Sequence, residues 1–259
     1  MTYSQPSSTS PNTMNETLRR SSKIVATLTM LAGVGAVAIG LMHWTDINWL
    51  RLSAFTAIGI VAAMLKVKLP GMNSSMSVNL PFILLATTEM SIPGVLIIAC
   101  VSALVQSLWH SQGQVKAVQI AFNLSAIAVA AEAAWFIFHN PPQAGLPAVA
   151  AMHVSLAAGG YLLVNTLLVG IMVAPVQQNG FGKVWTNILT LTFPYYVLSA
   201  GLAVTAISIS RYAGWPALLV LLAVMFGVYS SYKLYFRGKK PHSAETQPNR
   251  VMSAAGANG

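Results

Sequence analysis

Charged residues are scarce in this sequence of 259 residues. Asp, Glu, Lys and Arg make up 7% of the chain, whereas soluble domains carry about 25%. Hydrophobic residues make up 55%, and the mean hydropathy is +0.65. This balance excludes an ordinary soluble domain. Because several apolar runs approach or exceed membrane-spanning length, it indicates an integral α-helical membrane protein.

Cysteine and catalytic motifs are also lacking. Cys100 is the single cysteine, so an intrachain disulfide is excluded. The sequence has no His-Glu-x-x-His, no Walker loop and no Gly-x-Ser-x-Gly. His43, His139 and His153 lack the i,i+3 or i,i+4 spacing of a helical metal site. We therefore expect a protein that is not an enzyme and that holds neither a metal nor a cofactor.

Polar segments flank a long apolar region. Residues 1–23 and 237–259 are rich in small and polar residues, and we expect both to be disordered cytoplasmic tails. Residues 24–236 should form one membrane helical domain. The first apolar run follows basic residues, as in a signal peptide, but it continues to Met42, which favours a first membrane helix.

The number of crossings follows from the basic residues. The apolar segments are 24–44, 50–66, 79–92, 94–110, 118–138, 149–174, 187–209 and 215–236. Reading 79–110 as two segments leaves only Arg51 and Arg211 outside, so twelve of the fourteen basic residues are cytoplasmic (14 − 2 = 12). Reading 79–110 as one helix kinked at Pro93 removes this bias. We predict an all-α, polytopic bundle of about eight transmembrane segments with a short third–fourth hairpin and both termini cytoplasmic.

The net charge of +9 fits this topology. In a soluble chain such a charge would suggest a nucleic-acid partner. Here the basic residues flank apolar runs, where they orient the chain in a bilayer. We therefore expect the lipid bilayer, and no nucleic acid, as a partner.

The third segment is too short to cross a membrane alone. Residues 79–92 would span about 21 Å as a helix, against a hydrocarbon core of about 30 Å. Protein must therefore surround this segment, or extended backbone before it must add length. Short segments interrupted by Pro or Gly are typical of binding sites in transporters. A helical hairpin without a ligand, either crossing or re-entrant, remains the alternative.

Two glutamates lie within the apolar segments, Glu89 in the third and Glu132 in the fifth. A carboxylate in a bilayer is costly and indicates function. In the predicted topology both lie in the outer half, in the same layer as His153. The alternative is that each group reaches the interface or bonds a neighbouring helix. We expect residues 74–89 to line an outward-facing pocket whose ligand-binding residues are Asn79, Thr88, Glu89, Glu132, Trp135 and His153.

Small and amide residues predict how the helices pack. Ala121, Ser125 and Ala128 form one stripe with Glu132, which should place this carboxylate on the packed side of its helix. Asn123 and Asn165 should join neighbouring helices by hydrogen bonds.

Four stretches carry a resemblance to a known arrangement: MSVNLPFILLATTEMSIPGVLIIACVSALVQSLW (76–109), AFNLSAIAVAAEAAWFIF (121–138), YLLVNTLLVGIMVA (161–174) and RYAGWPALLVLLAVMFGVYSSYKLYF (211–236). Together they resemble the membrane sensor regions that precede HD-GYP, GGDEF or histidine-kinase output domains in bacteria. The hairpin is more weakly similar to substrate-binding subunits of energy-coupling-factor transporters. The chain departs from the sensor pattern after its last helix, where Gly238 and Pro241 stop the helix and no output-domain signature follows.

The resemblance implies a multi-pass protein of the bacterial inner membrane. Our first expectation is a stand-alone sensor-like domain that binds a small molecule from the outer side and signals through a cytosolic or membrane partner. A small-solute transporter, or a substrate-binding subunit of one, is the alternative. A structural membrane partner is the third possibility.

Overall fold

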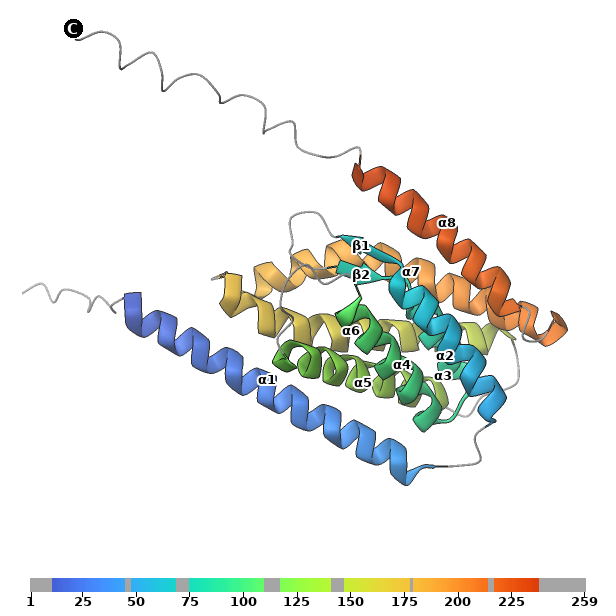
Figure 1. The fold of residues 1–259 in the computed structure, drawn as a ribbon, viewed down its shortest axis with the longest axis horizontal. Helices are drawn as coiled ribbons and strands as arrows, with labels where there is room; N and C mark the ends of the chain where they lie inside the picture. The colour runs from blue at the N-terminus through green and yellow to red at the C-terminus, as the bar shows by residue number, and fades with distance from the viewer. Residues whose placement is uncertain are drawn as a thin grey trace, which may run out of the picture.

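The fold is a bundle of helices with one small β-hairpin (Figure 1). The computed structural model describes residues 11–44, 48–68, 75–109, 117–140, 147–177, 179–213 and 217–237. The helices are α1 (Pro11–Met42), α2 (Trp49–Met64), α3 (Leu80–Glu89), α4 (Ile92–Leu108), α5 (Ala117–His139), α6 (Pro147–Gln177), α7 (Phe181–Ala213) and α8 (Ala217–Arg237). The strands are β1 (Lys66–Lys68) and β2 (Ser75–Ser77).

Each predicted apolar segment corresponds to one of these helices, and the largest difference lies at the start of the chain. The helix α1 begins at Pro11, whereas the sequence predicts a disordered tail through residue 23. A proline at the first helical position favours such a start, and the polar residues that follow extend the helix before its apolar part. Residues 1–10 and 238–259, on which the rest of the tail predictions fall, lie outside the described residues.

Within the described ranges, four helices are long and apolar enough to cross a membrane: residues 23–42, 117–139, 149–175 and 181–209. Residues 49–64, 80–89, 92–108 and 219–231 form shorter apolar helices. Large apolar side chains such as Leu31, Leu156, Val197 and Phe226 are exposed on the outside of the bundle. In water this surface would be unfavourable, and in a bilayer it faces lipid. The protein is therefore a helical membrane protein.

The helix pairs α2–α3, α4–α5 and α6–α7 each run in opposite directions. Arg51 at the start of α2 pairs with Glu89 at the end of α3. At the opposite end of these two helices, the N–H of Val78 just before α3 donates to the carbonyl of Leu65 just after α2. Ser107 near the end of α4 meets Asn123 near the start of α5, and Trp185 near the start of α7 reaches Thr166 in the second half of α6.

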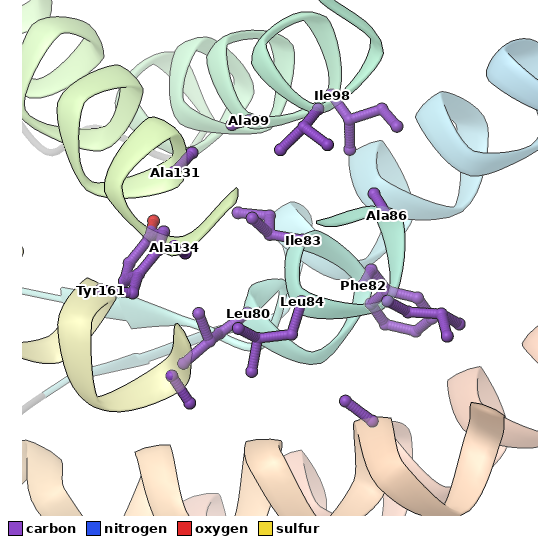
Figure 2. Close-up of a cluster of buried hydrophobic side chains, with 14 of the residues drawn as sticks. Leu80, Phe82, Ile83, Leu84, Ala86, Ile98, Ala99, Ala131, Ala134 and Tyr161 are labelled. Atoms are coloured by element: carbon purple, nitrogen blue, oxygen red, sulfur yellow. The ribbon is translucent and has the colours of Figure 1, made fainter. Parts of the chain in front are cut away.

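The short helix α3 lies inside the bundle. Its residues from Leu80 to Thr87 are all buried, and they pack against α2, α4, α5, α6 and α7 (Figure 2). The surrounding side chains include Ile98, Ala99, Ala131, Ala134 and Tyr161. Because protein covers α3 on all sides, its ten residues need not span lipid.

Extended backbone precedes α3, in the antiparallel hairpin of β1 and β2. Lys66 pairs with Ser77 and Lys68 pairs with Ser75. The sequence prediction allowed extended backbone here but did not predict a second strand to pair with it. The pairing satisfies backbone groups that a lone extended segment would leave open.

Amide side chains join the helices as predicted. Asn123 Nδ2 donates to Ser107 Oγ at 2.9 Å, which links α5 to α4. Asn165 Nδ2 donates to the Tyr196 hydroxyl at 3.1 Å, which links α6 to α7. Such bonds contribute about 0.6–2 kcal/mol each between membrane helices.

Candidate functional site

The candidate site lies at what we call the polar end of the bundle, where α1, α3 and α5 finish and α2, α4 and α6 begin. Short connections at this end bring residues distant in sequence together. Three of the predicted site residues, Thr88, Glu89 and Trp135, lie in the last two turns of their helices. Glu132 and His153 lie deeper, each about 10 Å along the helix axis from its end at this side.

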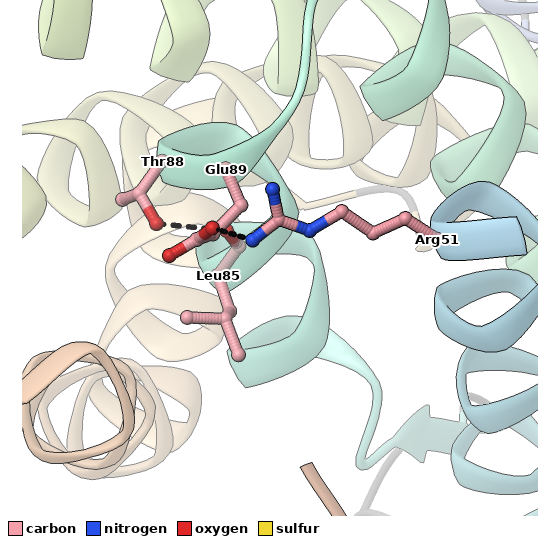
Figure 3. Close-up of polar contacts among 4 residues, drawn as sticks. All are labelled: Arg51, Leu85, Thr88 and Glu89. Carbon is pink, nitrogen blue, oxygen red and sulfur yellow. Dashed lines mark hydrogen bonds and ion pairs between the residues drawn. The ribbon is translucent and has the colours of Figure 1, made fainter. Parts of the chain in front are cut away.

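Glu89 is held by an ion pair. Its Oε2 accepts a hydrogen bond from Nη2 of Arg51 (Figure 3). The side chains are 22% and 48% exposed, respectively, so the pair sits at the edge of the bundle. The neighbouring Thr88 hydroxyl donates to the carbonyl of Leu85 at 2.8 Å, within α3 itself (Figure 3). Both side chains thus have partners that fix the last turn of α3.

Trp135 ties α5 to the break between α3 and α4. Its indole Nε1–H donates to the carbonyl of Met90 at 3.1 Å. Met90 and Ser91 separate the two helices. The Ser91 carbonyl accepts from the N–H of Val95 at the start of α4, whereas the Met90 carbonyl accepts the indole bond. The ring also stacks on His139, with 4.1 Å between ring centroids. Trp135 therefore stabilises the turn that directly follows Glu89.

The stripe of small residues on α5, which Glu132 continues, packs against α1. A Cβ on Gly33 would collide with Ser125, and Ala36 packs with Ala128 one turn further on. Close contact of this kind is typical of small residues between membrane helices. Glu132 continues the stripe, so its carboxylate lies under the last turns of α1.

Glu132 differs from Glu89 in its surroundings. Its Oε1 is buried and accepts no hydrogen bond from the described residues. His43, just past the end of α1, lies close enough to interact with this carboxylate electrostatically. The Nδ1 of His43 is itself 2.9 Å from the carbonyl of Ile39. A carboxylate oxygen that is buried without a donor costs free energy that a bound donor would recover.

His153 provides a second polar atom of this kind. The residue is 3% exposed, and its Nδ1 has no hydrogen-bond partner among the described residues. The ring lies edge to face with Phe138, at 6.3 Å between centroids, which fixes it between α5 and α6. A buried imidazole nitrogen can accept or donate a hydrogen bond according to its tautomer.

Asn79 lies apart from the other predicted site residues. It caps the N-terminus of α3 and is buried, with its carbonyl accepting from the N–H groups of Phe82 and Ile83. The ten residues of α3 separate it from Glu89 by about 15 Å. Residue 74, the start of the predicted pocket lining, lies outside the described residues.

Arg51 is the site residue that the sequence analysis missed. In the predicted topology, Arg51 is only one of the two basic residues on the outer side of the membrane. That position was itself a signal, because an isolated arginine beside a membrane favours a carboxylate partner, and Glu89 is one of five acidic residues in the chain.

Comparison with known proteins adds no relative. No protein-family model matches the chain, and neither a curated protein nor a solved structure matches it.

Proposed function

We propose that this protein is an eight-crossing protein of the bacterial inner membrane, with both termini cytoplasmic, and that it binds a small molecule from the outer side at its polar end. The antiparallel pairs α2–α3, α4–α5 and α6–α7 support the crossings. Reporter fusions after Lys116 and after the C-terminus should both read cytoplasmic. An external C-terminus would refute the topology.

The observation that carries the binding proposal is a pair of buried polar atoms, Glu132 Oε1 and His153 Nδ1, that lack hydrogen-bond partners in the described part of the chain. Leaving each such group unpaired costs about 1–3 kcal/mol. Proteins retain such groups where a ligand completes the bonding. We assign Glu132 and His153 to ligand binding, and Arg51, Glu89 and Trp135 to holding the adjacent α3–α4 break.

The chemistry of the two atoms limits the ligand. The Glu132 carboxylate requires a donor, such as an amine, an amide N–H or a hydroxyl group. The apolar and aromatic surroundings of His153 favour a molecule with an apolar part as well. The proposed ligand is therefore a small amphipathic molecule with at least one hydrogen-bond donor.

We place a sensor-like role first. Binding at the polar end would change the packing of α1 on α5, and α1 leads back to the N-terminal end of the chain. A cytosolic or membrane partner would then receive the signal. In this role the protein binds its ligand without moving it across the bilayer.

A transporter, or a substrate-binding subunit of one, is the second candidate, and the broken pair α3 and α4 favours it. The break at Met90 and Ser91 lies beside the proposed site, as interrupted helices do in transporters. Uptake of the ligand into proteoliposomes would support this role over that of a sensor.

Thermal unfolding of the purified protein against a panel of small amphipathic molecules tests the binding proposal. A ligand should raise the melting temperature of the wild type, and Glu132→Gln should weaken its binding about 10- to 100-fold. Thr205→Val is a matched control, because Thr205 is exposed on α7 and its hydroxyl donates to the carbonyl of Gly201 within the same helix. Equal ligand affinity in Glu132→Gln and the wild type would refute the site.

A further inference from the structure

The Glu132 carboxylate has no lysine or arginine partner among the side chains that the structure describes. At the polar end these side chains include Arg51, which is paired with Glu89 (Figure 3). Lys23 and Lys183 stand at the opposite end of the bundle, where the apolar spans of α1 and α7 begin. A carboxylate shielded from water without an opposite charge costs far more than an unpaired neutral group. A cation would therefore offset the cost at Glu132 more fully than a neutral donor.

His43 interacts electrostatically with Glu132, but its neutral imidazole cannot supply the missing hydrogen bond. The Nδ1 of His43 lies 2.9 Å from the carbonyl of Ile39. Because a carbonyl oxygen only accepts, Nδ1 carries the proton, and Nε2 of the neutral ring is an acceptor. The neutral ring thus has no N–H left for the carboxylate, which agrees with the open Oε1 of Glu132.

A metal ion does not fit the donor groups around Glu132. Calcium and magnesium take about six or more oxygen ligands, and zinc takes about four ligands from histidine, cysteine or carboxylate side chains. The described residues bring together no group of three or more such side chains. The cation that complements Glu132 should therefore be organic.

An aromatic ring lies one turn from Glu132 on the same face of α5. Trp135 follows Glu132 at i+3 and His139 follows at i+7, so the three side chains succeed one another along the helix. His139 covers one face of the indole, with 4.1 Å between ring centroids and 23° between ring planes. Because His139 lies one turn beyond Trp135, the other face of the indole is turned back toward Glu132. The face of an indole carries partial negative charge and attracts a cation.

We infer that the ligand of the proposed site is an organic cation, a protonated primary or secondary amine that carries an apolar body. Its ammonium group donates to the open Oε1 of Glu132 and lies against the indole of Trp135. A quaternary ammonium group fits less well, because it has no N–H to donate. The inference rests on the proposed binding function and narrows the ligand from any hydrogen-bond donor to a cation.

Isothermal titration calorimetry of the full chain in mild detergent at neutral pH tests this inference with phenethylamine and phenethyl alcohol. The two probes share an aromatic body and differ in the donor group, and an alkyl amine is protonated at this pH, as lysine is. We expect the wild type to bind the amine at least about tenfold more tightly than the alcohol, and Glu132→Gln to lose this preference. Trp135→Leu should bind the amine about two- to fivefold more weakly than Trp135→Phe. Both of these variants lose the bond to the Met90 carbonyl, and only the phenylalanine keeps a ring.

Two further variants keep the test specific. Trp49→Leu is the matched control for the ring, because Trp49 lies at the same end of the bundle and is 64% exposed, and it should bind the amine like the wild type. His43→Gln should keep the preference for the amine.

Equal affinity of the wild type for the two probes, or no saturable binding of the amine, would overturn the inference. So would amine binding that appears only in His43→Gln, because the imidazole would then already compensate the carboxylate. If Glu132→Gln weakens both probes equally, the inference fails and the proposed site stands, whereas unchanged binding of both probes in Glu132→Gln would refute the site itself.

Discussion

The two glutamates in the apolar helices have opposite surroundings. Glu89 ends a buried helix, reaches the edge of the bundle and pairs with Arg51. Glu132 lies deeper, against α1, and its Oε1 has no hydrogen-bond donor among the described residues. Glu89 thus has a protein partner for its carboxylate, whereas Glu132 has a carboxylate oxygen that can still accept a hydrogen bond.

The partner of each carboxylate separates a structural role from a binding role in these membrane helices. Their cost alone makes both glutamates candidates for function. At Glu89 the ion pair with Arg51 offsets that cost. Glu89 is then explained by a structural role at the α3–α4 turn, which Trp135 also stabilises. At Glu132 the cost remains, and an external donor is needed to offset it.

The largest effect should come from separating α1 from α5. Gly33→Ile places a branched side chain where even a Cβ meets Ser125, and overpacking of this kind costs about 1–3 kcal/mol. Thermal unfolding in detergent measures the loss. Gly35→Ile is the control, because a Cβ at Gly35 meets nothing within 4 Å. If both variants are equally stable, α1 does not cover Glu132 in the way described, and the contrast between the glutamates fails.

A smaller loss should follow from Trp135→Phe. The substitution keeps an aromatic ring beside His139 but removes the donor to the Met90 carbonyl. Loss of such a bond costs about 0.5–1.5 kcal/mol in the free energy of unfolding. Trp49→Phe is the control, since Trp49 is exposed at the start of α2. Equal stability of the two variants would show that the indole bond does not hold the α3–α4 break.

The smallest effect should be the coupling between Arg51 and Glu89. Because Arg51 is about half exposed, a double-mutant cycle with Arg51→Gln and Glu89→Gln should give about 0.2–1 kcal/mol. Added salt should reduce this coupling, because solvent ions screen exposed charges. A coupling free energy of zero would show that Arg51 does not stabilise Glu89, and the structural role assigned to Glu89 would then be wrong.

Much of the helical framework could be predicted from the sequence, because length, apolar content and basic flanks determine it locally. The burial of α3 followed from its shortness, and the packed position of Glu132 followed from the small residues on its stripe. The pairing of Arg51 with Glu89 could not be read from any local pattern, since 38 residues separate the two. The β-hairpin before α3 likewise depends on a contact between segments that hydropathy does not show.

Asn79 is another residue whose place in the packed structure the sequence did not predict. Its place in the polar segment before α3 suggested a ligand-binding residue, and in the structure it caps the far end of that helix. The sequence prediction grouped Asn79 with Glu89 in one pocket, whereas the ten residues of α3 place the two about 15 Å apart.

The most direct test of the account is mass spectrometry of small molecules that co-purify with the protein from its native membrane. We expect a small amphipathic molecule with a hydrogen-bond donor on the wild type and on Glu89→Gln, at least about tenfold less of it on Glu132→Gln, and the same loss on His153→Phe. Equal amounts of the molecule on all four proteins, or its loss from Glu89→Gln alone, would contradict the assignment of the open carboxylate as the binding site.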